Sequence, residues 1–531
     1  MITKDIIVVG GGIAGLIATL SLANSGREVL LLEKNESCGG LMNTFSRDGF
    51  QFEGGARALV NAGLIRTLVK EFALDIPLLP NPVTLGIEDK MLKVEGEKSL
   101  EQFAAILKGL YPESALEVDR VIRSIQGIME DMKVLYDANN PLFTKKEAFT
   151  WSLLPSLAIW MLKFTKTMYR MHKMNTPFEN HLDKLSTNQS LKDIIGQHFF
   201  RKTPAFFALS YFALYSDYLY PKGGVGAFVE QLVTAIGDRG GEIGFGREIC
   251  SIDPQDKCLT DSGGASYQYN KMIWAGDLKT LYAIIIDEGL DKPTVANFRK
   301  KKQAVMSHKG AESVFTVFMG VDLPPEYFQE KGSGHSFYTP NRKGIGVIHT
   351  QELQDLMRRS DTLKIEELLA WSERFCRYNT FEISIPVLRD ADAAPLGKTG
   401  VIISVLFDFE LTSMIHAKGW YEEFANGFAE QIVNVISASI YPGLKEKVLF
   451  SFAATPNTIK ERVASSDGSI VGWSFEGEIP AVTSMINLGN SVKTELPDVY
   501  VAGKWVYSPA GGPTAIMTGR IAAKECLYKI H

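Results

Sequence analysis

The sequence predicts an α/β protein in which a parallel sheet is assembled from separated segments of the chain and a second, α+β domain is inserted between them. Two observations carry this prediction. The chain opens on a strand–turn–helix–strand unit of about 30 residues, a unit whose strands must lie parallel. Similar strand and helix patterns return near residues 271 and 499, after long segments that have strand-like runs of their own.

The composition excludes several classes of protein. Hydrophobic residues make up 45% of the 531 residues and charged residues 22%, as in a globular chain with a large core. The formal net charge of −5 argues against a nucleic-acid partner. The five cysteines are scattered with no CxxC pair and the histidines form no metal-binding motif, so we expect neither disulfides nor a metal site.

No segment predicts a signal peptide or a membrane span. Glycines interrupt the first apolar run after a few residues, and Pro155 interrupts the uncharged run over residues 149–162. That run is also shorter than the roughly 20 residues that a span needs. We therefore expect a cytoplasmic protein, placed at the inner face of the membrane if one of its surface helices binds lipid.

The opening unit contains two short runs, residues 6–9 and 29–32, that are rich in Val, Ile and Leu, as strands buried on both faces are. Residues 14–25 between them are rich in Ala and Leu and predict a helix that stops at Gly26.

Later segments complete the same domain. They are a helix over residues 228–239, a strand near Ile249, strands at residues 271–274 and 499–502, and a last helix over residues 513–528. The first domain then comprises residues 1–80, 220–294 and 490–531, and the inserted domain residues 81–219 and 295–489. Strand-like runs of the later insert lie at residues 314–321, 381–386 and 401–407.

A glycine-rich turn joins the first strand to the first helix in the pattern G-x-G-x-x-G. Gly10 permits the tight turn, Gly12 lets a pyrophosphate approach the backbone at the helix N-terminus, and Gly15 lets helix and strand pack closely. Glu33 ends the second strand, where its carboxylate can accept hydrogen bonds from an adenosine ribose and repels a 2′-phosphate. This is a Rossmann-like dinucleotide site. Its other expected residues are Ile13, Ala14 and Lys34.

The residues after Glu33 indicate which dinucleotide binds. Gly39-Gly40 and Thr44 follow in an E-x5-GG-x3-T pattern, and residues 50–55 read FQFEGG. This pattern resembles the extended FAD signature of the amine-oxidase-like flavoprotein superfamily. Paired glycines let a loop pass close to the cofactor's phosphates and ribityl chain, which extends the site towards a flavin. An NAD-dependent dehydrogenase has no need of such a loop.

Further segments narrow the resemblance to phytoene desaturases, carotenoid isomerases and retinol saturases. Residues 49–59 (GFQFEGGARAL) are similar to the segment after the glycine doublet in those enzymes, and residues 497–503 with 510–519 are similar to their C-terminal FAD segment. Less specific similarities to their substrate domain lie at residues 220–226, 240–242, 388–398, 455–456 and 472–473. The FAD contacts that the resemblance implies are Gly39, Gly40, Leu41, Gly54, Gly55, Ala56, Arg57, Ile249, Gly276, Gly503, Gly512, Pro513 and Thr514.

Two positions depart from the pattern of that family. Leu41 follows the glycine doublet where amine oxidases usually have Arg. Lys504 follows Gly503 where many relatives have an acidic residue that bonds the ribityl chain. Because a Lys side chain cannot accept that bond, we expect backbone N–H groups to hold FAD there.

The resemblance also places groups near the flavin ring. A flavin that accepts hydride at N5 becomes an anion near N1, and positive potential stabilises this anion. The N-terminus of the last helix, at Pro513 and Thr514, either supplies such potential through its dipole or only closes the domain. Arg57 stabilises reduced flavin, orients a substrate or only forms a surface salt bridge. No general base stands out.

Two segments predict contact with lipid or an apolar substrate. Within an expected membrane-facing part, residues 149–174, one helix face carries large apolar side chains and the opposite face only positive charges. Such a helix either lies on an anionic membrane or packs on its own domain. The apolar set is Leu157, Trp160, Met161, Phe164 and Met168, and the basic set is Lys163, Lys166, Arg170 and Lys173. The aromatic-rich residues 205–215 either line a tunnel or fill the core.

The leading hypothesis is a FAD-dependent oxidoreductase that desaturates, saturates or isomerises carbon–carbon bonds of an apolar polyene or isoprenoid lipid. The first alternative is an amine-oxidase-like flavoenzyme acting on a small soluble substrate, and Leu41 counts against it. The second is a non-catalytic lipid carrier resembling Rab GDP-dissociation inhibitors. Such a carrier would not need the glycines and Glu33 of the FAD motif, all of which are present.

Overall fold

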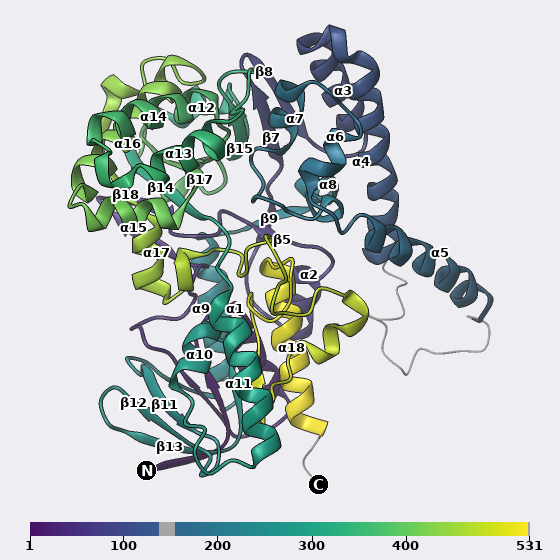
Figure 1. Ribbon diagram of the computed structural model, residues 1–531, viewed down its shortest axis with the longest axis vertical. Coiled ribbons are helices and arrows are strands. Elements are labelled where there is room, and N and C mark those ends of the chain that lie inside the picture. The colour runs from purple at the N-terminus through teal and green to yellow at the C-terminus, as the bar shows by residue number, and fades with distance from the viewer. Residues whose placement is uncertain (137–153, 529–531) are drawn as a thin grey trace.

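Two large sheets organise the molecule, which the computed structural model describes over residues 1–136 and 154–528. The predicted α/β class is confirmed. The first sheet lies at the lower end of Figure 1, together with both chain termini, and the second lies in the upper part among a larger number of helices.

The first sheet is parallel at its centre and antiparallel at one edge. Its strand order is β10-β2-β1-β13-β12-β11, and β19 also pairs with β13. The parallel strands are β10 (Glu242–Gly244), β2 (Val29–Leu32), β1 (Ile2–Val9), β13 (Ser266–Trp274) and β19 (Val499–Val501). The antiparallel strands are β12 (Cys258–Asp261) and β11 (Ile249–Asp253). The sequence therefore predicted the parallel core but not the antiparallel extension.

Helices cover both faces of this sheet because its strands are apolar on both sides. In β1, Ile6 and Val8 pack with α1 (Ile13–Asn24), α9 (Val225–Gly237) and α18 (Gly512–Tyr528). Ile7 and Val9 point to the opposite face, where they join the apolar cluster of α10 (Leu278–Ile284) and α11 (Lys292–Ser307). The last helix packs closely on the first, since a Cβ added at Gly519 would lie 2.4 Å from the Ala14 carbonyl oxygen.

The second sheet is antiparallel except where β7 and β15 pair in parallel. Its order is β18-β14-β17-β16-β15-β7-β8. The strands are β18 (Val448–Ala454), β14 (Ser313–Val321), β17 (Thr399–Phe407), β16 (Phe381–Ser384), β15 (His335–Thr339), β7 (Val83–Ile87) and β8 (Lys90–Val94). Three strands predicted from the later insert, β14, β16 and β17, thus become neighbours in one mixed sheet.

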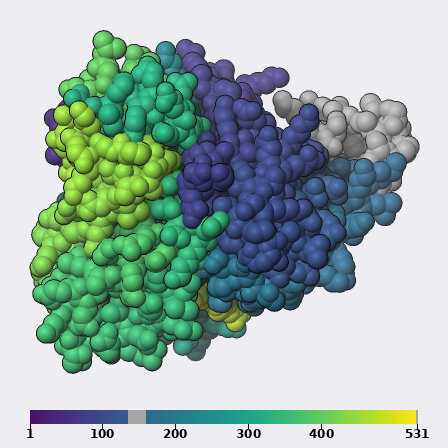
Figure 2. Space-filling model, turned by 90° about the horizontal axis from the view of Figure 1, so that it is seen from above, coloured from purple at the N-terminus to yellow at the C-terminus, as the bar shows by residue number. Residues whose placement is uncertain are grey.

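Helices cover one face of the second sheet. A second group of helices lies beside its β7–β8 edge. One face packs against α13 (Leu353–Arg358), α14 (Ile365–Tyr378), α15 (Phe409–Ala417) and α16 (Tyr421–Ala438). A helical cluster beside β7 and β8 comprises α3 (Lys98–Leu110), α4 (Ala115–Tyr136), α6 (Phe178–Asp183), α7 (Gln189–Gly196) and α8 (Ala205–Leu214). Seen from above, these two groups of helices, green and blue, occupy opposite sides of the molecule (Figure 2).

Short elements connect the two sheets. The hairpin of β3 (Thr44–Arg47) and β4 (Phe50–Glu53) packs its phenylalanines against Phe318 and Ile402 of the second sheet. A small sheet of β5 (Leu59–Val60), β9 (Tyr218–Pro221) and β6 (Leu78–Pro80) follows, with α2 (Ile65–Glu71) beside it in the chain. Among the described residues, the remaining α-helices are α5 (Leu154–Lys173), α12 (Pro325–Gln329) and α17 (Pro456–Val463).

The predicted amphipathic helix forms as α5 (Leu154–Lys173) and extends away from the helical cluster (Figure 1). Phe164 and Met168 pack against that cluster, whereas Met161 is 56% exposed. The predicted apolar face is therefore only partly turned inward. Residues 149–153 and the side chain of Leu157 lie outside the described residues. Within the described part of the chain, no helix has both the length and the apolar character needed to cross a bilayer.

Candidate active site between the two sheets

The glycines of the G-x-G-x-x-G motif lie where β1 ends and α1 begins. Gly10 has a φ of +103°, and a Cβ added at Gly15 would lie 1.9 Å from the Gly10 carbonyl oxygen, so both positions require glycine. Gly12 is the N-cap of α1, but no side chain caps the helix and its first turn carries no acidic residue. A Cβ added at Gly12 would meet no atom within 4 Å. Open space thus lies against the uncapped N–H groups of Ile13 and Ala14, as an anion site needs.

Glu33 is fixed beside this turn. Its Oε2 accepts a hydrogen bond from Gly11 N at 2.6 Å, and its Oε1 accepts from Asn35 N at 3.0 Å. The carboxylate has lone pairs to spare for a ribose hydroxyl. Arg247 N donates to the Glu33 carbonyl oxygen (2.8 Å), which brings the chain leading to Ile249 next to Glu33. Lys34 instead donates from Nζ to the Glu461 carbonyl oxygen (3.0 Å).

The two glycine doublets lie against neighbouring backbone. Gly39 N donates to the Gly11 carbonyl oxygen at 2.8 Å, and a Cβ added at Gly55 would lie 2.0 Å from the Leu41 carbonyl oxygen. Ala56 N donates to the same Leu41 oxygen. Asn43 Oδ1, which a Cβ at Gly54 would approach to 2.2 Å, is buried without a partner. An orphaned acceptor here fits a bound cofactor chain that carries hydroxyl groups.

The glycine-rich turn and the two glycine doublets form two sides of a cradle for the cofactor. A segment near the end of the chain adds the third side. Gly276 follows β13, Gly503 follows β19, and Gly503 N donates to Thr518 Oγ1 of α18 at 3.0 Å. Helix α18 begins at Gly512, so Pro513 and Thr514 lie in its first turn. Helix α18 also contacts β5 (Leu59–Val60), the strand that follows the Gly54–Arg57 segment in the chain.

Around the second doublet, a buried network of charges joins β4 and β9 to the second sheet. The fully buried Glu53 accepts hydrogen bonds from the Tyr220 hydroxyl and from Ser384 Oγ (3.4 Å). Arg389 Nη2 lies 3.6 Å from Glu53 Oε2, and the Arg389 guanidinium stacks over the Tyr220 ring at 4.1 Å. Arg389 Nη1 also donates to the Arg57 carbonyl oxygen at 3.0 Å.

Arg57 belongs to this network and is only 5% exposed, so the alternative of a surface salt bridge is wrong. Its guanidinium donates to the Glu53 carbonyl oxygen and to Ser404 Oγ (2.8 Å). Its Nε is buried and has no partner, which leaves one N–H to donate to a bound molecule. Burial lowers the pKa of Arg57, and the nearby Glu382 and Glu53 carboxylates oppose this shift.

One cross-strand row on the second sheet continues from Arg57. Strand register places its members side by side in the order Thr316, Ser404, Glu382, Phe337 and Leu85, one from each of β14, β17, β16, β15 and β7. We call these five residues the floor row. Paired residues on neighbouring strands share a face of the sheet. The row therefore runs from the contact with Arg57 to the helical cluster.

Glu382 is the charged member of the floor row, with 30% of its side chain exposed. His335 Nε2 lies 2.9 Å from Glu382 Oε1. Burial alone would raise the pKa of Glu382, but the hydrogen bond with His335 and the charges of Arg57 and Arg389 outweigh it, so the pKa is lowered. The floor row therefore carries a partly exposed, ionised carboxylate at neutral pH.

Comparison with known proteins identifies this combination of cradle and sheet. The family model of flavin containing amine oxidoreductases matches residues 13–355, well over half of the chain. The chain belongs to this family. It is a FAD-dependent oxidoreductase of the amine oxidase, carotenoid desaturase and retinol reductase kind.

Three curated relatives of this flavoenzyme align over nearly its whole length. All-trans-retinol 13,14-reductase of Danio rerio is 21% identical (94% of this chain, 82% of the relative). Chloroplastic prolycopene isomerase of Daucus carota is 22% identical (98% and 79%), and neurosporene-forming phytoene desaturase of Rhodobacter capsulatus is 22% identical (98% and 93%). The crystal structure of an oxidoreductase from Methanosarcina mazei has the same fold, with a TM-score of 0.60 at 13% identity over 98% of this chain and 100% of that one.

Lys504, which stands where many relatives have an acidic residue, has a structural role in this flavoenzyme. Lys504 Nζ donates to Ser465 Oγ at 2.8 Å and to the Ser469 carbonyl oxygen at 2.6 Å. It therefore holds the loop over residues 465–469 to the first domain. Burial lowers the pKa of Lys504 to about 8, with the charge of Asp277 opposing this shift.

Sequence reasoning missed the second half of the site. In the sequence, Glu53 appears only within a glycine-rich segment, and Glu382, Ser384 and His335 belong to no recognised motif. The available signal was the alternation of polar and apolar residues in the strand-like run over residues 381–386, which places Glu382 and Ser384 on one face.

Proposed function

We propose that this flavoenzyme desaturates, saturates or isomerises carbon–carbon bonds of an apolar polyene or isoprenoid lipid, with hydride transfer through flavin N5. The observation that carries the proposal is the floor row. It leads from the cradle to aromatic and aliphatic side chains, with Arg57 and Glu382 as the charged groups near its cradle end. The printed names of the relatives, which refer to retinol, prolycopene and phytoene, support the same substrate class.

The residues that would hold FAD follow from the cradle. The α1 N-terminus with Gly12 takes the pyrophosphate, Glu33 the adenosine ribose, and the doublets at Gly39 and Gly54 line the path towards the flavin ring. When bound, FAD supplies the hydride acceptor or donor. We place FAD on the domain formed by residues 1–80, 220–294 and 490–531, and the lipid on the domain formed by residues 81–219 and 295–489.

The chain's own groups then have distinct roles. Arg57 Nε offers a hydrogen bond and positive charge at the cradle end of the floor row. Glu382 is placed to accept the proton that a desaturation removes from a carbon of the lipid, and His335 orients its carboxylate. Phe337 and Leu85 offer only apolar surface, which orients a hydrocarbon chain along the row.

Helix α5 would bring the enzyme to its substrate in an anionic membrane. Its outer surface exposes apolar and basic side chains together, with Leu162 74% and Tyr169 60% exposed beside Lys163 and Lys166. Co-sedimentation with anionic vesicles, compared with neutral vesicles, tests this. We expect the double substitution Lys163→Glu and Lys166→Glu to abolish the preference for anionic vesicles, whereas Lys108→Glu on α3 leaves it unchanged.

The decisive test is turnover by the flavin-loaded enzyme with membranes supplied. A panel of carotenoids, retinoids and prenyl alcohols is incubated aerobically, and also anaerobically with reduced flavin, and the products are separated by chromatography. We expect conversion of at least one polyene or isoprenoid. Peroxide release from an amine, with no change in any lipid of the panel, would overturn the proposal in favour of the amine-oxidase alternative. A protein that takes up no FAD would favour the carrier.

A further inference from the structure

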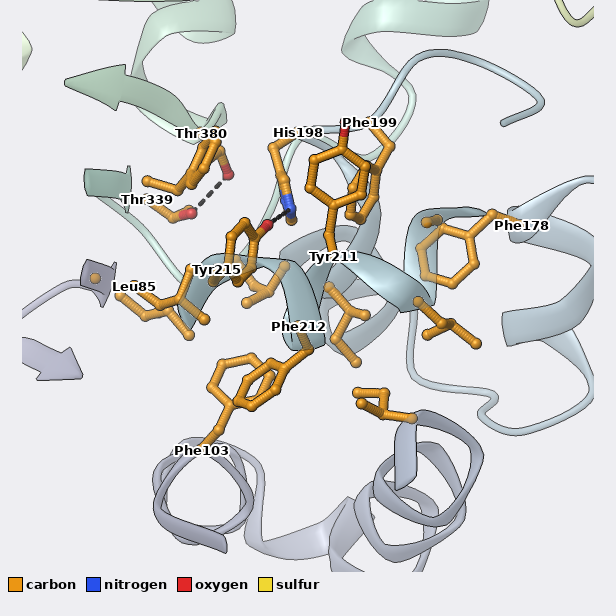
Figure 3. A pocket seen from close by; sticks show the side chains of 18 residues that line it. Leu85, Phe103, Phe178, His198, Phe199, Tyr211, Phe212, Tyr215, Thr339 and Thr380 are labelled. Carbon is orange, nitrogen blue, oxygen red and sulfur yellow. Dashed lines mark hydrogen bonds between the residues drawn. The ribbon is translucent and has the colours of Figure 1, made fainter. Parts of the chain in front are cut away.

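A cavity of about 60 Å³ lies at the far end of the floor row, between the second sheet and the helical cluster. Figure 3 shows side chains that point into it from several elements. Leu85 and Phe337 line it from the sheet, Phe103 and Phe212 from α3 and α8, and Ala208 from the middle of α8. The aromatic-rich residues 205–215 thus serve as cavity wall and core together.

The polar side chains at the cavity edge bond to one another. His198 Nε2 lies 3.0 Å from the Tyr215 hydroxyl, and Thr339 Oγ1 lies 2.6 Å from Thr380 Oγ1, as the dashed lines in Figure 3 mark. Burial lowers the pKa of His198 to about 4, so its ring is neutral near pH 7. None of the lining residues is Asp, Glu, Lys or Arg. A water needs two to four polar partners, and an ionised group needs a counter-charge, so this cavity suits an uncharged, apolar occupant.

The size of the cavity matches a short branched hydrocarbon. One water-sized group takes roughly 10–15 Å³ of such space, so this cavity accepts about four to six heavy atoms. An isoprene unit has five carbons. We propose that this cavity is the subsite for the terminal isoprene unit of the lipid substrate, an inference that rests on the proposed function.

The position of the cavity agrees with that role. Neighbouring strands lie about 4.8 Å apart, so the floor row from Leu85 to Thr316 spans four such steps, or about 19 Å. A chain whose last unit fills the cavity would cross Phe337 and then Glu382 before it reaches Arg57. The cavity therefore sets which carbon–carbon bond of a long chain lies at Glu382, and so selects substrates by the distance from chain end to reacting bond.

Filling the cavity tests the proposal. Ala208 is buried, and Ala208→Leu would place three additional carbons in this space. The matched control is Ala213→Leu, the same change on the same helix at a partly exposed position that does not line the cavity. Binding of farnesol and of geranylgeraniol, which differ by one isoprene unit, is measured by equilibrium fluorescence quenching on the flavin-loaded enzymes. Flavin absorption spectra verify that the cofactor site is intact.

With the hydroxyl group held by Arg57 at the other end of the floor row, only the longer alcohol places its last isoprene unit in the cavity. We therefore expect the wild type and Ala213→Leu to prefer the longer alcohol by at least about tenfold, since each buried methylene contributes about 0.8 kcal/mol. In Ala208→Leu this preference should fall to within about twofold, because the side chain occupies the place of the last unit. If Ala208→Leu fails to fold, Ile194→Phe fills the same cavity from α7.

Two results would overturn the subsite. One is equal affinity of the wild type for both alcohols. The other is a full preference that persists in folded, flavin-loaded Ala208→Leu or Ile194→Phe. Failure of the wild type to bind either alcohol or to convert any polyene is a different result, because it contradicts the proposed function itself.

Discussion

The cofactor cradle and the floor row meet at Arg57 but are built in opposite ways. In the cradle the chemistry resides in the backbone: uncapped N–H groups, a positive-φ turn and glycines whose missing side chains leave room. On the floor row it resides in side chains that β-sheet register brings into line from five strands. The cradle can therefore serve one cofactor in many enzymes, whereas the row can change its substrate by single side-chain substitutions.

The network between the two regions should give the largest effect. Glu53→Ala removes the carboxylate that Arg389 faces and leaves this buried guanidinium without its ion pair, whereas Arg57 keeps its hydrogen bond to the carbonyl oxygen of residue 53. Breaking a buried ion pair in this way costs about 3–5 kcal/mol of the free energy of unfolding. Denaturant unfolding of the flavin-loaded protein measures the loss. Glu101→Ala, at an exposed position of α3, is the control. An equally small loss of unfolding free energy in both variants would show that the network does not stabilise the protein.

Lys504 offers a test within the cradle domain. Its folded-state pKa of about 8 lies below the ordinary value of 10.5, so between these pH values the unfolded chain binds the proton and the folded one does not. Stability should therefore rise from pH 8 to pH 10.5, by up to about 3 kcal/mol at roughly 1.4 kcal/mol per pH unit. Lys504→Met should remove this part of the pH dependence, although it also removes the two hydrogen bonds to the loop over residues 465–469. If the free energy of unfolding changed with pH in the same way in both proteins, Lys504 would not be the group responsible.

Gly12→Ala separates cofactor affinity from folding. The new Cβ would meet no protein atom within 4 Å, and the φ of −70° suits alanine, so the flavin-free protein should unfold at an unchanged denaturant midpoint. Affinity for FAD should fall at least about tenfold, because the methyl group occupies the approach of the pyrophosphate. Gly237→Ala, which also meets no atom, is the control. Unaltered FAD affinity in Gly12→Ala would place the cofactor elsewhere.

Glu382→Gln should give the smallest effect, confined to the floor row. We expect normal FAD content and about tenfold lower turnover of the lipid, because the amide cannot accept a proton. Since the pKa of Glu382 is lowered below 4.5, wild-type turnover should hold between pH 7 and 5 and fall in more acidic solution, and the variant should lack that fall. Glu373→Gln on the exposed side of α14 is the control. Equal turnover by both variants would exclude Glu382 from proton transfer.

The same contrast explains what the sequence could predict. The cradle was accessible because its residues follow one another at fixed spacing, from Gly10 to Gly15 and from Glu33 to Gly40, and each spacing has a local geometric cause. The floor row and the Glu53 network were not accessible. Glu53, Tyr220 and Arg389 are far apart in the chain, and only the pairing of strands shows that they touch. Pairing depends on tertiary packing, which no single segment encodes.

The close packing of α18 on α1 has a consequence for folding during synthesis of the chain. β1 and α1 are synthesised first, but the strand β19 and the helix α18 that complete their domain come from the last part of the chain. A nascent chain that has not yet exposed residues 499–528 at the ribosome lacks one wall of the cradle. Uptake of FAD must therefore follow the emergence of residues 499–528 from the ribosome, whereas the second sheet, whose strands all precede residue 455, is free to fold earlier in translation.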